Sequence, residues 1–475
     1  MCSLNEIIRT ARTQSFDFDI TFLISMPSLP RCWLVLLGFF LVVNNHFGRG
    51  FSTTQRRRRR QRSSGGSDEI EAISRALQII YRESGTLGVL RRSDGILEQY
   101  QATSLVEAAI VASRGSKGVA SGILNAFLGA AVCSSEGGGN YAVQLMNAYD
   151  KLEEEYRLQP NLVALSLAYV ATYKEEGHSQ IAQRYLQRAE ELYSEDVQQT
   201  QQLQRSTIME PKPDVWSNLK DNHGIQLLQD QKEFVVLSKP SGMVCYHANV
   251  TSTKLSNKAQ PRNKKRKNKS TDISLETCLL DGGVPLSTLN SQGRGMVHRI
   301  DRGTSGCIIL AKTNSMHAKL LVQFFLKKQI KKSYQALVAV SPKQRQQIIL
   351  PKEGCICVDI DGRPAESNYH LEQSFANGKV SRIRVQTEQG RRHQVRLHCA
   401  EGLSAPILLD PLYGGISAML QLNAPAQELC RKIKAQKKFC LHANSLAIPD
   451  YGIDVEAPLP EWWQELEQLI TIEHE

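Results

Sequence analysis

Charged and hydroxylated side chains suited to a reactive site gather around Asp301. Arg299 and Arg302 flank this aspartate, and Thr304 and Ser305 follow it at the start of an apolar run. Nearby cations keep a carboxyl group ionised at neutral pH, and local hydrogen bonds from hydroxyl groups can fix its orientation. An ionised, oriented carboxylate suits a nucleophile or a general base. It equally suits a structural turn, the ordinary interpretation of an isolated aspartate in a loop.

The segment around Asp301 resembles the catalytic motif of RluA-type pseudouridine synthases. That motif is written H-R-[LI]-D-x-x-T-S-G-x-x-x-x-A-K, and every fixed position is matched from His298 to Lys312. Further segments of the C-terminal half resemble the family's other motifs in the family's order, which is far more specific than one motif. They are FVVLSKPSGMVCYH (234–247), KKSYQALV (331–338), EQGRRHQVRLH (388–398, expected as a strand), DPLYGG (410–415) and LHANSLAI (441–448).

The resemblance implies an RNA-modifying isomerase that needs no cofactor. In the family's reaction the C1′–N1 bond of a uridine is broken, the uracil turns, and C5 is joined to C1′. Asp301 would attack C1′ or remove the 2′ proton, and both routes stay open. Tyr334 would stack on the uracil, and its surroundings would handle the C5 proton. Arg396 would pair with the aspartate, keeping it charged and in place.

RNA contacts are expected around the motifs and in a basic insertion. Arg299 would hold a phosphate or assist extrusion of the target base, whereas His298 would be structural or would contact the RNA backbone. The insertion, residues 248–271, has no acidic residue and is predicted to be a disordered surface loop that neutralises phosphates. A nuclear signal and a loop without function are its alternatives. The other predicted RNA-binding residues are Arg302, Arg391, His393, Lys264, Lys265, Arg266 and Lys267.

The chain departs from the family's pattern at a few positions. Ile300 replaces the commoner Leu, and Cys307 occupies a place that is usually aliphatic. Arg392 replaces a usual Thr or Ser, and Leu409 replaces the usual Gly before Asp410. The last two changes would alter RNA contacts or a local turn, and none of the four removes a chemical group that the reaction needs.

The C-terminal part, residues 211–475, is predicted to be an α+β catalytic domain. Short runs rich in Val, Ile and Leu alternate there with Gly and Pro breaks, a pattern typical of strands. The resemblance implies a curved mixed β-sheet with the active cleft across its face. The predicted strands are 233–237, 307–310, 334–340, 380–385 and 439–448, and the predicted helices are 315–329 and 425–437.

Residues 68–210 are predicted to form an all-α region. Apolar residues recur there at helical spacing, and two helix pairs align at an offset of 42 residues as a weak internal repeat. The segment from Leu158 to Leu192 resembles a pentatricopeptide repeat, which would read single-stranded RNA. A helical bundle that only packs is the alternative. Because the region stands where many relatives carry an S4-like domain, we hypothesise that it selects the RNA.

Residues 1–67 have the composition of a targeting presequence. An apolar run of 12 residues precedes an acid-free stretch with the arginines at 56–60, which resembles a bipartite plastid presequence. A mitochondrial presequence is the rival, and a tail with a nuclear signal in a nuclear or cytoplasmic protein is the further alternative. The apolar run is too short to span a bilayer, so no stable membrane association is expected of the mature protein.

Composition excludes several other classes of protein. With 41% hydrophobic and 22% charged residues, the chain is neither largely disordered nor collagen-like. Its 11 cysteines include no Cys-x-x-Cys, so neither a disulfide framework nor a zinc site is indicated. A monomer acting on ribosomal, transfer or messenger RNA is expected. The rivals are an RNA-binding protein with an idle synthase domain, and a hydrolase, which would need a second carboxylate near Asp301.

Overall fold

The computed structural model describes most of the chain from residue 65 onward. The predicted insertion and nearly all of the predicted presequence lie outside the described residues. Residues 65–475 belong to one compact unit. The described residues are 65–93, 97, 99–134, 137–193, 214–247, 273–290, 293–326, 330–339, 350–387 and 389–471.

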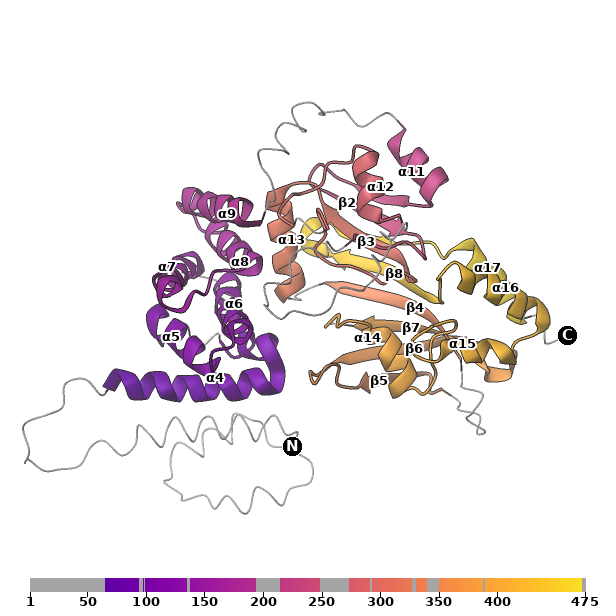
Figure 1. The fold of residues 1–475 in the computed structure, drawn as a ribbon, viewed down its shortest axis with the longest axis horizontal. Coiled ribbons are helices and arrows are strands. Elements are labelled where there is room, and N and C mark those ends of the chain that lie inside the picture. The colour runs from indigo at the N-terminus through magenta and orange to yellow at the C-terminus, as the bar shows by residue number, and fades with distance from the viewer. Residues whose placement is uncertain are drawn as a thin grey trace, which may run out of the picture. The chain divides into compact units, whose positions relative to one another are not determined.

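The described residues up to 193 are helical, as predicted. The predicted two helix pairs correspond to α6 with α7 and to α8 with α9. The first helix is kinked at Gly85, whose φ of 64° lies in the left-handed region. The helices are α4 (Gly65–Leu90), α5 (Ala102–Ala112), α6 (Lys117–Cys133), α7 (Gly138–Tyr156), α8 (Leu162–Tyr173) and α9 (Ser179–Tyr193), shown in Figure 1.

Small and apolar residues account for the packing of these helices. Asn161 caps α8 by accepting a hydrogen bond from the backbone N–H of Ala164 at 2.9 Å. Alanines such as Ala168 and Ala182 are buried where helices meet, and their small side chains allow close approach. The helices therefore form a hydrophobic core of their own.

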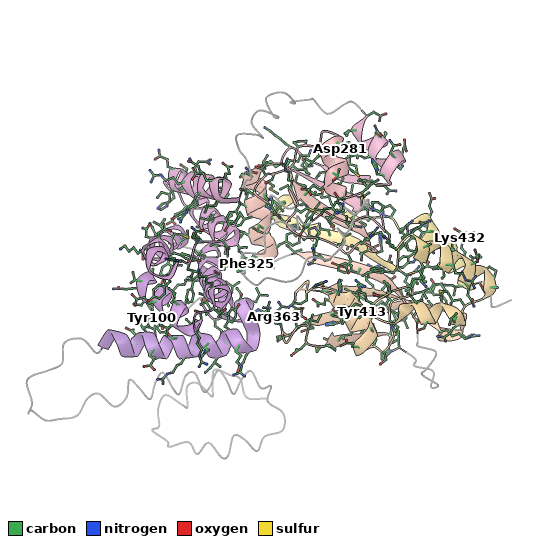
Figure 2. The ribbon with its side chains drawn as sticks, in the orientation of Figure 1. Tyr100, Asp281, Phe325, Arg363, Tyr413 and Lys432 are labelled. Atoms are coloured by element: carbon green, nitrogen blue, oxygen red, sulfur yellow. The ribbon has the colours of Figure 1, made fainter. Side chains whose placement is uncertain are left out.

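This helical core extends onto a helix of the C-terminal part, α13 (Asn314–Leu326). Ala318 and Val322 of α13 are buried in the same hydrophobic cluster as the residues of α8, and Phe325, labelled in Figure 2, packs against it. The hydroxyl groups of Tyr169 and Ser315 are hydrogen-bonded at 2.8 Å. The helical region thus uses α13 as one of its packing partners.

A mixed sheet forms the centre of the C-terminal part. Among the described residues its strands follow the order β1-β2-β3-β8-β4-β7-β6-β5, with β9 paired to β8. Neighbours are antiparallel except β3 and β8, which are parallel. The strands are β1 (Gln226–Asp230), β2 (Phe234–Lys239), β3 (Ser305–Ala311), β4 (Lys331–Ala339), β5 (Glu353–Cys357), β6 (Glu366–Phe375), β7 (Val380–Thr387), β8 (Leu441–Ile448) and β9 (Ile453–Glu456).

The sheet and its covering helices confirm the predicted α+β class. The five strands predicted from apolar runs are found, as β2, β3, β4, β7 and β8, and the two predicted helices are α13 and α16. Short apolar runs in β2 and β3 are buried along their whole length, which explains their lack of alternation. The remaining α-helices of the described residues are α11 (Val215–His223), α12 (Leu275–Asp281), α14 (Gln394–Leu397), α15 (Gly415–Ala418), α16 (Ala424–Ala435) and α17 (Glu461–Thr471).

The prediction of a strand at 388–398 is wrong. The chain turns at Gly390 and His393, both with positive φ, and then forms the short helix α14. Gln394, Val395 and Arg396 are buried consecutively. A strand on one face of a sheet buries alternate residues, whereas one helical turn enclosed by loops can bury three in a row. Within the described residues, no helix is long and apolar enough to cross a membrane.

Candidate active site

Asp301 lies on the short loop that leads into β3. The backbone N–H of Thr304 donates to the carbonyl oxygen of Asp301 at 3.1 Å, which closes a turn. Gly303 allows this turn to approach Phe439, because a Cβ at Gly303 would lie 2.2 Å from the Phe439 ring. The Asp301 side chain is 28% exposed, so a ligand can reach its carboxylate.

The two hydroxyl groups after this turn do not orient the aspartate as the sequence suggested. The Ser305 hydroxyl is hydrogen-bonded to Nδ1 of His442 at 2.8 Å, and it therefore ties β3 to β8. The Thr304 hydroxyl is buried without a hydrogen-bond partner and lines the cavity beside Asp301. The side chain of Asp301 instead accepts a hydrogen bond from Arg396, which lies far along the chain.

Arg396 of α14 joins Asp301 to a second carboxylate, Asp410. Its Nη1 donates to Asp301 Oδ2 at 2.9 Å, while Nε and Nη2 donate to the two oxygens of Asp410 at 2.7 and 2.9 Å. Asp410 is fully buried and also accepts from the backbone N–H of Leu412. Such bidentate, charge-assisted hydrogen bonds fix the guanidinium plane. The predicted pairing of Arg396 with Asp301 is present in this structure.

Aromatic rings enclose this charged group. The guanidinium of Arg396 lies over the rings of Phe439 and Tyr413, 4.6 and 5.1 Å from their centroids. Burial lowers the pKa of Arg396, but the hydrogen bonds and negative charges of Asp410 and Asp301 outweigh it, so that the net shift is upward. Arg396 is therefore a permanent cation beside Asp301.

His393 is the second basic group near Asp301. Its Nε2 lies 3.5 Å from Asp301 Oδ1, and its Nδ1 is hydrogen-bonded to the Tyr413 hydroxyl at 2.8 Å. The backbone of His393 has φ of 56°, an uncommon conformation for a residue with a side chain. Burial lowers the pKa of His393 more than Asp301 raises it. The imidazole is therefore mostly neutral at pH 7.

Tyr334 enters the same cavity from β4. Tyr334 is half-buried. Burial of the phenol is the main cause that raises its pKa to about 12, and the charges of Asp301 and Cys307 act in the same direction. The hydroxyl is therefore protonated at neutral pH and able to donate a hydrogen bond to a ligand. The cavity of about 380 Å³ has both Tyr334 and Asp301 in its lining.

The other predicted RNA-binding residues occupy different settings. His298 is half-buried: its Nε2 accepts from the backbone N–H of Ile309 at 3.1 Å, and its ring stacks on Phe324 at 4.7 Å. Arg299 is exposed at the cavity. Arg302 donates from Nε to the carbonyl of Gly242 at 2.9 Å. The positions of His298 and Arg302 point to structural roles. Arg299 donates from Nη1 to the Tyr246 hydroxyl at 3.5 Å, and it is exposed where a ligand can reach it from solvent.

Arg391 lines the cavity with a buried Nε that has no hydrogen-bond partner. Burial, and next the charge of Arg363, lowers the pKa of its guanidinium. A buried donor without a partner is costly unless a ligand supplies an acceptor. Lys264, Lys265, Arg266 and Lys267 of the insertion lie outside the described residues.

A second cavity, of about 430 Å³, also has Asp301 in its lining. It shares Asp301, His393 and Arg396 with the first, and Lys434 and Lys438 line it as well. Sequence reasoning missed these two lysines, as it missed Asp410. The signal for the lysines was the run KIKAQKK at the end of a predicted helix, and that for Asp410 was the DPLYGG segment.

Comparison with known proteins is in line with this geometry. The sequence profile of the family described as RNA pseudouridylate synthase matches residues 233–401. An uncharacterized RNA pseudouridine synthase of Zymomonas mobilis is 35% identical over 183 residues, which are 36% of this chain and 75% of the relative. The chain belongs to the RNA pseudouridine synthase family. Pseudouridine synthases are isomerases, so the predicted enzyme class is confirmed at this level.

Other members share less of their length with the chain. The ribosomal large subunit pseudouridine synthase D of Pasteurella multocida is 31% identical over 38% of this chain and 57% of its own length. RNA pseudouridine synthase 2, chloroplastic, of Oryza sativa is 31% identical over 36% of this chain and 43% of its own length. The chain thus spans about half the length of these two relatives. The helical region precedes the family match, and its resemblance to pentatricopeptide repeats gains no support.

Among solved structures, human RNA Pseudouridylate Synthase Domain Containing 4 is similar with a TM-score of 0.36 and 20% identity, over 51% of this chain and 92% of that one. The family's synthases modify RNA, and the site of this member combines an accessible carboxylate, a fixed cation and a protonated phenol. Such a group can stabilise charge at a sugar carbon and hold an aromatic base.

Proposed function

We propose that this protein isomerises uridine to pseudouridine within a structured ribosomal or transfer RNA. The supporting observation is the Asp301–Arg396 contact, in which a buried cation holds an accessible carboxylate at 2.9 Å. Asp301 acts on the sugar, either by attack at C1′ or by removal of the 2′ proton. The C1′–N1 bond breaks, the uracil turns, C5 bonds to C1′, the C5 hydrogen leaves as a proton, and N1 takes up a proton from water. Atoms and electrons balance without a cofactor.

The remaining residues hold the nucleotide during this rearrangement. Tyr334 stacks on the uracil, and Arg299 and Arg391 contact the phosphates or assist extrusion of the base, whose unstacking costs a few kcal/mol. Arg396 holds the carboxylate of Asp301 in position, and His393 lies beside it. The basic insertion, with Lys264 to Lys267, adds affinity that does not depend on sequence.

The helical region is proposed to extend the RNA-binding surface. A cleft of about 450 Å³ is lined by Arg91 and Arg92, which follow the end of α4, and by Arg391, which precedes α14. Arg391 also lines the cavity that contains Asp301. Phosphates on one RNA can therefore bridge the two parts of the protein. The protein is proposed to act as a monomer.

Release of tritium from RNA that contains C5-labelled uridine tests the activity. The full chain is expected to release tritium, and Asp301→Asn, which keeps the shape of the side chain but removes its charge, should slow release by about 10³-fold or more. Asp281→Asn, an exposed aspartate at the end of α12 (Figure 2), serves as the matched control and should leave the rate unchanged. Release that is equal in wild type and Asp301→Asn would refute the assignment.

The second candidate is an RNA-binding protein whose synthase domain is idle. It is favoured only by the basic insertion, residues 248–271, and it predicts tight RNA binding by the wild type with no release of tritium. A hydrolase that uses Asp301 is disfavoured because the nearest carboxylate in this constellation, Asp410, is buried and engaged by Arg396.

An organellar location is proposed, with the plastid ahead of the mitochondrion. The support is the composition of residues 1–67 together with the chloroplastic relatives of Oryza sativa and Arabidopsis thaliana. A fluorescent fusion of the full chain, with and without residues 1–67, tests it. Nuclear or cytoplasmic fluorescence that does not change on deletion would contradict the proposal.

A further inference from the structure

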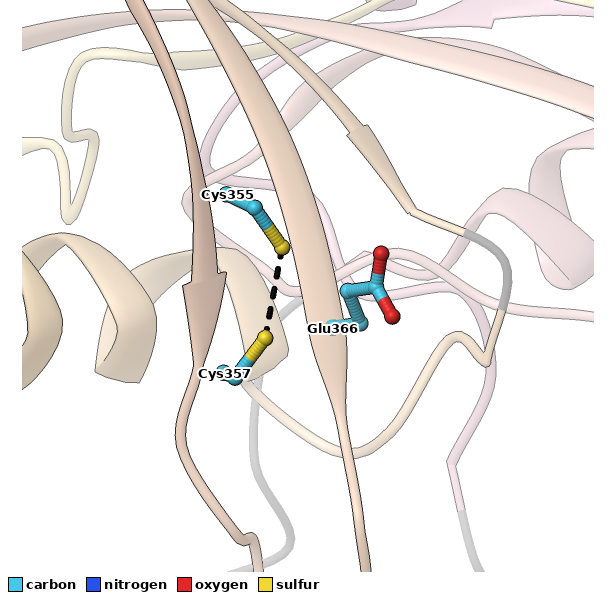
Figure 3. A group of neighbouring side chains, drawn as sticks. All are labelled: Cys355, Cys357 and Glu366. Carbon is cyan, nitrogen blue, oxygen red and sulfur yellow. Dashed lines mark hydrogen bonds between the residues drawn. The ribbon is translucent and has the colours of Figure 1, made fainter. Parts of the chain in front are cut away.

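Two exposed thiols lie side by side on β5, the edge strand of the sheet. Cys355 and Cys357 are separated by one residue, so their side chains project from the same face of the strand. Their Sγ atoms are 3.3 Å apart and share a hydrogen bond (Figure 3). The other described cysteines are buried or half-buried. These two are therefore the thiols in the described residues that solvent and ions reach most easily.

Glu366 completes a group of three ligands from the neighbouring strand. It is the cross-strand partner of Cys357 in the antiparallel pairing of β5 with β6. One carboxylate oxygen and the two sulfur atoms all lie within 4.8 Å of one another, and all three residues are exposed (Figure 3). A zinc ion binds sulfur at about 2.3 Å and carboxylate oxygen at about 2.1 Å. Two ligand atoms bound to the same zinc ion therefore lie at a separation close to that already present between the sulfur and oxygen atoms of these three residues.

We propose that Cys355, Cys357 and Glu366 form a binding site for a thiophilic divalent cation of the zinc type. Two thiolates select zinc over the hard cations Mg²⁺ and Ca²⁺, which prefer oxygen ligands. On binding, the two thiol protons pass to water, and the ion forms two bonds to sulfur and one to the carboxylate. Water takes the fourth tetrahedral position. The backbone pairing of β5 with β6 already fixes the three ligands, so little ordering is needed.

The site is connected to the loop of the active site through the backbone of Glu366. Its N–H donates to Gln389 Oε1 at 3.0 Å, and its carbonyl accepts from Gln394 Nε2 at 2.7 Å. The turn between these glutamines carries Arg391 and His393. Cys357, Glu366 and Arg391 also line one cleft, the cleft of Arg91 and Arg92. A bound cation would therefore neutralise Glu366 beside the arginines and hold the strand end that anchors the turn.

Titration of the reduced full chain with Co²⁺ tests the site without recourse to catalysis. Thiolate-bound Co²⁺ has charge-transfer absorption bands in the near ultraviolet, which carboxylate and imidazole ligands do not produce. The wild type is expected to develop these bands up to one equivalent, and Zn²⁺ should displace the Co²⁺ and abolish them. Cys355→Ser and Cys357→Ser should each lose most of the band intensity, and Glu366→Gln should bind at least tenfold more weakly.

Cys133→Ser provides the matched control, because it removes a half-buried thiol from the end of α6 and should leave the titration unchanged. Circular dichroism establishes that each variant is folded. Absence of the bands in the reduced wild type, or bands that persist in both Cys355→Ser and Cys357→Ser, would overturn the proposal. The result is independent of tritium release, so a failed metal site and a failed synthase assignment are told apart.

Discussion

Asp410 and Arg396 form a buried pair that sets the position of the accessible carboxylate, Asp301. Arg396 donates two hydrogen bonds to Asp410, at 2.7 and 2.9 Å, which leaves its Nη1 directed at Asp301. Asp410 is completely buried, whereas the side chain of Asp301 is 28% exposed. Asp410 thus fixes the position of the Arg396 cation, and Arg396 in turn fixes the position of Asp301. Because Asp410 is buried and Asp301 is partly exposed, only Asp301 can meet a ligand.

Replacing Asp410 by Asn should weaken both the fold and catalysis. The variant leaves the Arg396 cation buried without its full counter-charge, and loss of one partner of a buried pair costs about 3–5 kcal/mol. The free energy of unfolding in urea should fall by this order, and tritium release by the folded fraction should fall because Arg396 no longer orients Asp301. Glu428→Gln, in an exposed pair with Arg431, is the control and should change stability by less than about 1 kcal/mol. Equal effects of the two substitutions would contradict this account.

His298 should contribute to instability in acid. Burial, and next the charge of Lys332, lowers its pKa to about 3, whereas an unfolded histidine titrates near about 6.5. The unfolded chain therefore binds more protons between these values, and stability present above about pH 6.5 is lost as the pH falls. Between about pH 7.5 and about pH 5 the wild type should lose about 2 kcal/mol more than His298→Gln, measured by urea unfolding.

Glutamine is chosen at position 298 because its carbonyl oxygen can still accept from the Ile309 N–H. His370→Gln, on the exposed face of β6, controls for removal of an imidazole from the sheet. If wild type and His298→Gln lost stability in parallel with falling pH, the imidazole of His298 would not be enclosed as the stacking on Phe324 indicates.

Leu409 is a departure from the family's pattern whose consequence the structure makes visible. Its φ of 70° lies in the left-handed region, where a side chain is unfavourable by roughly 1–2 kcal/mol and glycine is not. Glycine at 409 should therefore be at least as stable as alanine. At the equally buried Leu408, whose φ is not positive, glycine should be less stable than alanine by about 1 kcal/mol.

Urea unfolding of Leu409→Gly, Leu409→Ala, Leu408→Gly and Leu408→Ala gives the comparison directly. Both leucines lose a buried side chain in either substitution, so the difference between glycine and alanine isolates the backbone. The same order of stability at both positions would show that Leu409 is not strained.

The sequence predicted candidate site residues wherever a reactive side chain stands inside a recognisable motif. Motifs predicted Asp301, Tyr334 and Arg396 as site residues, and apolar runs that are buried throughout predicted β2 and β3. Asp410 was not singled out, because its role depends on Arg396, 14 residues earlier, and no local pattern links the two. Residues 388–398 were predicted as a strand from the resemblance to the family's motif, whereas the chain forms the short helix α14 there and buries three consecutive residues.

The contact between the helical region and the catalytic domain was equally invisible in the sequence. Ala318 and Val322 look like ordinary core residues of α13, and nothing in their spacing indicates that they pack against another region. This contact limits what deletion of the helical region can show. Deletion of residues 68–210 would uncover these apolar side chains, so loss of activity on deletion would not distinguish misfolding from loss of RNA contacts. Surface substitutions in the full chain avoid this problem.

Reversal of charge at Arg91 and Arg92 tests whether the helical region contacts the RNA. Both residues line the cleft that continues to Arg391, and each neutralised phosphate steepens the dependence of affinity on salt. The double variant Arg91→Glu/Arg92→Glu should bind the natural RNA at least tenfold more weakly, with a salt slope reduced by about 2. Turnover on a minimal stem-loop should be retained. Arg75→Glu/Arg82→Glu, at two exposed positions of α4, the helix that precedes Arg91 and Arg92, is the matched control. Equal loss by both double variants, or equal loss on both substrates, would assign the helical region no part in RNA selection.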